Sequence, residues 1–65
     1  MADLPVAAVE RLIRRVGAER VSPEAAAELR DVLEEIGLEV AAKAAKLAKH
    51  AGRKTITAAD IKLAR

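Results

Sequence analysis

With 65 residues, the chain has room for one domain and a small core, and a chain of this size buries only about 60% of its unfolded surface. It contains no cysteine and no aromatic residue, which excludes disulfides and cysteine-based metal sites and requires an aliphatic core. A net charge of +2 is too small to indicate a partner by itself. Oligomerisation is the remaining common route to stability, so we expect an obligate dimer.

The first predicted helix covers about residues 5–16. Leu4-Pro5 begins it, and Asp3 is placed to interact favourably with its N-terminus. Gly17 ends it after about three turns. Its apolar stripe has helical spacing and consists of Val6, Val9, Leu12, Ile13 and Val16.

The second predicted helix is long, covering about residues 23–51. Ser22 is a preferred N-cap, Pro23 is tolerated at the first helical position, and Gly52 supplies the left-handed residue that ends the helix. Its apolar surface is wider than the single stripe of about 100° that one packing neighbour would cover, so this helix needs more than one neighbour. Its members at three- and four-residue steps are Leu29, Val32, Leu33, Ile36, Val40, Ala44 and Leu47. The surface continues around one side of the helix through Leu38, Ala41, Ala42, Ala45 and Ala48.

The last predicted helix covers about residues 58–65. Thr57 and Asp60 resemble a capping box, with Asp where Glu is commoner. The chain therefore reads as an all-α protein with a short helix, a long central helix and a short helix, forming one domain over residues 1–65. The short helices leave the middle of the long helix uncovered, and a second copy crossing it on a two-fold axis would cover it.

Several runs, in this order and at this spacing, resemble the archaeal histones, the minimal histone-fold proteins. They are Leu4-Pro5-Val6-Ala7, Gly17-Ala18-Glu19-Arg20-Val21-Ser22, Leu33-Glu34-Glu35, Lys46-Leu47-Ala48-Lys49-His50-Ala51-Gly52-Arg53-Lys54-Thr55-Ile56 and Ala59-Asp60-Ile61. The resemblance implies a histone fold and a handshake homodimer in which two long helices cross. It also implies that the first link of one copy lies beside the second link of the other.

Basic residues of the first helix and of the two links are the candidate DNA contacts. On sequence alone, arginines one helical turn apart are as readily explained by a solvated helix face as by a DNA contact. Cations in loops are usually exposed to solvent without a partner. The resemblance favours contacts with the phosphate backbone of double-stranded DNA, and with the minor groove for Arg11, as histone arginines do. No group is placed to read base edges, so we expect little base specificity. The predicted set is Arg11, Arg14, Arg15, Arg20, Arg53, Lys54 and Thr55.

Arg53 and Asp60 match a family pair in which the arginine of the second link clamps the last helix. The alternative is that Asp60 interacts only with its own helix terminus, and both can hold at once. By resemblance, dimers join further into tetramers or longer assemblies through Leu47, His50, Asp60 and Leu63. Archaeal histones commonly carry several more residues after the position of Arg65, so we expect this contact to be weaker here.

Catalysis is not expected, because the sequence has no nucleophile beside a base, no glycine-rich phosphate loop and no metal-binding motif. We therefore predict no enzyme activity, cofactor or metal, and no membrane partner. The expected function is sequence-nonspecific DNA bending, wrapping and compaction as a chromatin protein, in the cytoplasm on the chromosome. Two alternatives stay open: a histone-fold module that only dimerises with another protein, and a dimer that bends or bridges DNA without wrapping it.

Overall fold

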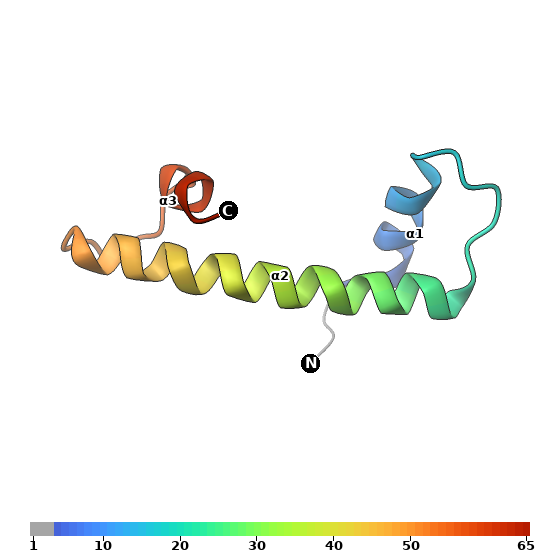
Figure 1. Ribbon diagram of the computed structural model, residues 1–65, viewed down its shortest axis with the longest axis horizontal. Helices are drawn as coiled ribbons and strands as arrows, with labels where there is room; N and C mark the ends of the chain where they lie inside the picture. The colour runs from blue at the N-terminus through green and yellow to red at the C-terminus, as the bar shows by residue number, and fades with distance from the viewer. Residues whose placement is uncertain (1–3) are drawn as a thin grey trace. The chain divides into compact units, whose positions relative to one another are not determined.

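The computed structural model describes residues 4–65 and is all-helical over that range, without strands. Three helices follow one another: α1 (Val6–Arg14), the long α2 (Pro23–His50) and α3 (Ala58–Ala64) (Figure 1). This order confirms the predicted all-α class with a long central helix. Asp3, which was expected to interact with the start of the first helix, lies outside the described residues.

The chain divides after Glu35 into two compact units. The first unit holds α1 and the first half of α2, and the second unit, Ile36–Arg65, holds the rest of α2 together with α3. The organisation as one domain stays a prediction.

In the first unit, α1 is shorter than the sequence indicated. Pro5 is not its first residue but its N-cap, with an extended backbone (φ −66°, ψ 127°), so the helix begins at Val6. It ends at Arg14, before a turn closed by Gly17, whose φ of +96° is left-handed. The buried residues of this unit are Val9 and Ala26, with 4% and 0% of their surface exposed.

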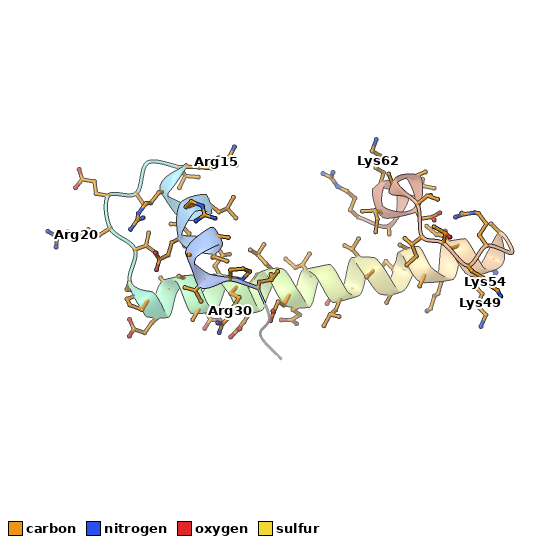
Figure 2. All side chains as sticks on the ribbon, turned by 180° about the vertical axis from the view of Figure 1, so that it is seen from behind. Arg15, Arg20, Arg30, Lys49, Lys54 and Lys62 are labelled. Atoms are coloured by element: carbon orange, nitrogen blue, oxygen red, sulfur yellow. The ribbon has the colours of Figure 1, made fainter. Side chains whose placement is uncertain are left out.

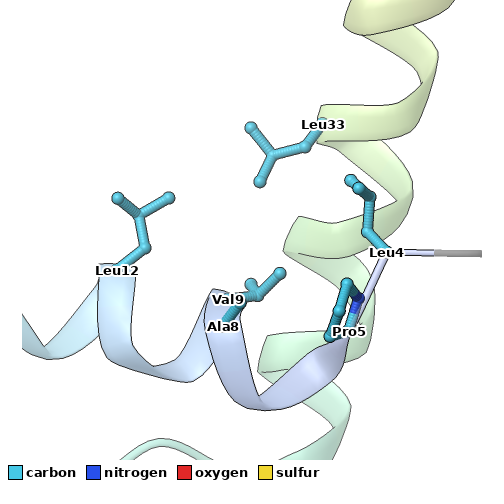
Figure 3. A pocket seen from close by; sticks show the side chains of 6 residues that line it. All are labelled: Leu4, Pro5, Ala8, Val9, Leu12 and Leu33. Carbon is cyan, nitrogen blue, oxygen red and sulfur yellow. The ribbon is translucent and has the colours of Figure 1, made fainter.

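An open apolar groove of about 240 Å³ lies between the start of α1 and α2 in the first unit (Figure 3). Its lining is entirely aliphatic: Leu4, Pro5, Ala8, Val9, Leu12 and Leu33. The backbone N–H of Leu4 donates to Glu34 Oε2 at 2.9 Å, which ties the chain entering α1 to α2 beside this groove. Among residues 4–65 the groove is therefore an open part of the apolar surface.

Both ends of α2 use the residues that the sequence indicated. At its start, the Ser22 hydroxyl accepts a hydrogen bond of 3.0 Å from the backbone N–H of Ala25. At its end, Gly52 takes a φ of +72°. The backbone N–H of Gly52 then donates to the Lys49 carbonyl at 3.0 Å, and that of Arg53 to the Ala48 carbonyl at 2.9 Å. These two bonds form a Schellman motif, which folds the second link back onto the last turn of α2.

In the second unit, α3 is a helix of seven residues that begins with the predicted capping box. The Thr57 side chain accepts from the backbone of Asp60, and the Asp60 side chain accepts from the backbone of Thr57. The core here consists of alanines, with Ala44, Ala48 and Ala64 exposed by 0%, 2% and 7%. So short a helix depends on its cap and its packing.

No large side chain among residues 4–65 is fully buried within one chain. Ten large aliphatic side chains are instead exposed: Leu4, Leu12, Val16, Val32, Ile36, Leu38, Leu47, Ile56, Ile61 and Leu63. The buried set is too small to offset the conformational entropy lost on folding. The single chain therefore has the elements of a fold without the core that would stabilise it.

Candidate nucleic-acid interface

Arg53 and Asp60 form a bidentate ion pair that joins the second link to α3. Arg53 Nη2 donates to Asp60 Oδ1 at 2.8 Å, and Arg53 Nη1 donates to Asp60 Oδ2 at 2.9 Å. Asp60 Oδ2 also accepts from the Thr57 backbone N–H at 2.8 Å and from the Thr57 hydroxyl at 3.1 Å. Asp60 is only 3% exposed, so it clamps Arg53 and caps α3 at the same time.

Four donors on one carboxylate favour its charged form. The hydrogen bond from Arg53, followed by that from the Thr57 backbone, holds the pKa of Asp60 well below its usual range despite the opposing effect of burial. The same hydrogen bond raises the pKa of Arg53. Both groups of this pair, which we call the clamp, are therefore charged throughout the physiological pH range.

The clamp also determines which cations of the second link are available to a ligand. Arg53 Nη1 donates to the Thr55 carbonyl at 2.9 Å as well as to Asp60, so three of the five N–H donors of its guanidinium are used within the chain. Lys54 and Thr55 are exposed and have no side-chain hydrogen bond or ion pair among the described residues. Of the predicted contacts in this link, Arg53 thus orients the backbone, and Lys54 and Thr55 are presented to solvent.

Arg20 projects from the link between α1 and α2 in the first unit (Figure 2). It is exposed and has no ion-pair partner within residues 4–65. Its expected neighbours, Lys54 and Thr55, belong to the second unit. Their juxtaposition is expected between two copies of the chain and stays a prediction.

The α1 arginines Arg11, Arg14 and Arg15 are all exposed. Arg11 and Arg14 lie in the last turn of α1, where a positive charge also stabilises the carbonyl end of the helix, by about 0.3–1 kcal/mol. They lack ion-pair partners in the described part of the chain, unlike Arg30, which bonds Asp31 at 3.3 Å. They therefore combine a structural role with availability to an anion.

The residues expected to join dimers all lie in the second unit. Leu63 is 76% exposed, Leu47 is 36% exposed and His50 is exposed, whereas Asp60 is buried in the clamp. Three of these side chains are accessible to another molecule, and the fourth acts mainly within its own chain. The contact between dimers stays a prediction.

Sequence reasoning missed how completely Thr57 contributes to the clamp. The capping-box spacing predicted the backbone exchange between Thr57 and Asp60, but it gave no sign that the hydroxyl also donates to the carboxylate. It also missed the bond from Arg53 to the Thr55 carbonyl, because backbone acceptors in a link carry no residue-specific signal.

Residues 4–65 contain no group of three or more metal-ligating side chains that could hold an ion. None of the described helices is both long enough and apolar enough to cross a membrane.

Residues 2–64 match the family described as histone-like transcription factor (CBF/NF-Y) and archaeal histone. The chain is 56% identical over 64 residues to one of the subunits of archaeal histone HAN1 from Thermococcus zilligii, covering 98% of this chain and 96% of that protein. It is 50% identical over 64 residues to probable archaeal histone 3 of Methanocaldococcus jannaschii, with the same coverage of 98% and 96%. Both similarities extend over nearly the whole of each chain.

Proposed function

Since the chain belongs to the family of histone-like transcription factors and archaeal histones, and is thereby a DNA-binding chromatin protein, we propose that it bends and wraps duplex DNA without sequence specificity. The active form in this proposal is a handshake homodimer, and dimers join into tetramers or longer assemblies on the DNA. The family packages DNA and is structural rather than enzymatic. Association with the nucleoid follows from that role.

The observation that carries this proposal is the separation of the link cations into two kinds. Arg53 is neutralised by Asp60, whereas Arg20 and Lys54 are exposed and unpaired in the described chain. Exposed cations beside backbone N–H groups suit phosphate oxygens, and binding them releases the counterions condensed on DNA. Because phosphates are the same at every base pair, such contacts bind DNA without reading its sequence.

The exposed aliphatic surface supports the dimer. Ile36 and Val32 on α2 are 51% and 39% exposed in the single chain, and the groove beside α1 is open and entirely aliphatic among the described residues. A two-fold partner crossing α2 would remove such surface from water at about 25 cal/mol per Å². Folding and dimerisation are then one process that depends on protomer concentration.

The test is the variant Arg20→Ala/Lys54→Ala/Thr55→Ala, compared with the wild type for binding a duplex of mixed sequence at several salt concentrations. It removes four cations from a dimer, so the slope of log K against log salt should become shallower by about 3.6. Lys46→Ala/Lys62→Ala removes the same charge from exposed sites outside the proposed surface and should keep most of the slope. Unchanged affinity and slope in the triple variant would show that the DNA surface is wrongly assigned.

Two outcomes distinguish the alternatives. A helical wild-type dimer that fails to bind duplex DNA at low salt would favour a module that only assembles with proteins. Binding that bends or bridges DNA, but protects no wrapped length, would limit the function to an architectural dimer.

A further inference from the structure

We propose that Lys49, at the end of α2, forms with Lys54 a paired-lysine site for one DNA phosphate, adding a residue to the DNA surface described above. This inference rests on the proposed DNA-binding function and extends its surface from the second link onto α2. Lys49 lies outside the links and was not among the predicted contacts.

The Schellman motif brings the backbone segments that carry these two lysines to the same end of α2. Arg53 is hydrogen-bonded through its backbone to the Ala48 carbonyl, and Gly52 to the carbonyl of Lys49 itself. The residue after Arg53 therefore leaves the turn beside the last turn of α2. Figure 2 shows Lys49 and Lys54 at this one end of the second unit.

No carboxylate of the second unit neutralises this pair of lysines. The unit has seven Lys and Arg residues but only two acids, Glu39 and Asp60. Asp60 is buried in the clamp, and Glu39 is ten residues before Lys49, about 15 Å along the helix, which exceeds the Debye length at physiological salt. Two like charges placed together without a counter-charge repel each other, and a phosphate between them removes that repulsion.

The clamp makes the paired-lysine site a fixed feature. Arg53 holds the Thr55 carbonyl on one side of Lys54, and the Schellman bonds hold the other side. The backbone on which Lys54 is carried is therefore restrained at both flanking residues. Only the two lysine side chains need to be ordered when a phosphate binds, which lowers the entropic cost of the contact.

Lys62 offers a matched control within the same unit. It is exposed, carries the same charge and lies on α3, and its side chain points away from Lys49 and Lys54 (Figure 2). Lys49→Gln and Lys62→Gln therefore make the same change in net charge. Only the first removes a member of the paired-lysine site.

The experiment measures binding of the full-length dimer to a mixed-sequence duplex between 50 and 200 mM salt for the wild type, Lys49→Gln, Lys49→Arg and Lys62→Gln. Circular dichroism and sedimentation first establish that each variant is a helical dimer under these conditions. The Lys49→Gln dimer loses two phosphate-binding cations, one from each copy, while Lys54 is retained, so its salt slope should be shallower by about 1.8. The ratio of the wild-type affinity to the Lys49→Gln affinity should therefore be about 12-fold smaller at 200 mM salt than at 50 mM salt.

Lys49→Arg should restore the wild-type slope, and Lys62→Gln should leave it nearly unchanged. A Lys49→Gln slope equal to that of the wild type would overturn the inference while leaving the proposed function in place. An equal reduction in Lys62→Gln would also overturn it, because net charge alone would then explain the change. A wild type that shows no salt-dependent binding would instead refute the proposed function on which the inference rests.

Discussion

Replacing Gly52 by alanine tests whether the left-handed turn after α2 stabilises the fold. Gly52 has a φ of +72°, and a Cβ added there would meet no atom within 4 Å, so the cost is conformational rather than a clash with neighbours. A left-handed L-residue costs about 1–2 kcal/mol. The reduced entropy of the unfolded chain offsets about 0.4–1 kcal/mol of this. The net loss is about 1 kcal/mol per chain, or about 2 kcal/mol for a dimer that unfolds as a unit.

The assay is urea unfolding followed by circular dichroism at one fixed protomer concentration. A loss of 2 kcal/mol corresponds to about a 30-fold change in the equilibrium constant for dimer unfolding. Gly37→Ala is the contrasting variant, because Gly37 lies inside α2 and its added Cβ also meets no atom of the chain within 4 Å. It should gain about 1 kcal/mol per chain from helix propensity. A Gly52→Ala variant as stable as the wild type would refute the reasoning.

Three further predictions concern the cap, the clamp and the dimer. Thr57→Ala removes the N-cap of α3 and should lower the free energy of unfolding in urea by about 1 kcal/mol per chain. Thr57→Ser keeps the capping hydroxyl and should stay close to the wild-type stability. Equal losses in the two variants would contradict the capping role. Because the pKa of Asp60 is depressed in the folded chain, the clamp stabilises fully above the ordinary Asp pKa of about 3.9 and is lost as pH falls toward the native value. Asp60→Asn should therefore be less stable than the wild type at pH 5–8, and its free energy of unfolding should fall less than that of the wild type as the solution is acidified. Parallel curves of unfolding free energy against pH for the two proteins would contradict this. Ile36→Gln should shift the protein toward monomer in sedimentation. Leu38→Gln, at a side chain that is 73% exposed and two residues further on, and therefore not on the same face of α2 as Ile36, should shift it less. An unshifted Ile36→Gln would remove that residue from the interface.

Features decided by local backbone chemistry were predictable from the sequence. Ser22 and Thr57 cap their helices and Gly52 ends α2, because each role depends on residues within one turn. The start of α1 was predicted one residue early, since Pro5 suits both a first helical position and an extended N-cap. The hydrophobic spacing similarly predicted that this helix continues to residue 16, but it ends at Arg14, before the turn that Gly17 closes.

The use of each cation was less predictable. Arg53 and Lys54 are adjacent, equally basic in the sequence and both exposed, yet Arg53 is paired with a buried carboxylate and Lys54 has no ion-pair partner among the described residues. This difference arises from the fold of the second link, in which the Schellman motif and the capping box bring Arg53 to Asp60. Sequence spacing suggested the pair, but it could not show that the guanidinium would also be bound to a backbone carbonyl.

The central claim, that dimers of this chain wrap and compact duplex DNA, is tested most directly by nuclease digestion. Purified protein would be reconstituted on long duplex DNA of mixed sequence over a range of protein-to-DNA ratios, and the protected fragments sized. A regular ladder of protected lengths is the result predicted for dimers that wrap DNA and join along it. A single short protected length would contradict the joining of dimers, and the absence of any protection at low salt would contradict the claim as a whole.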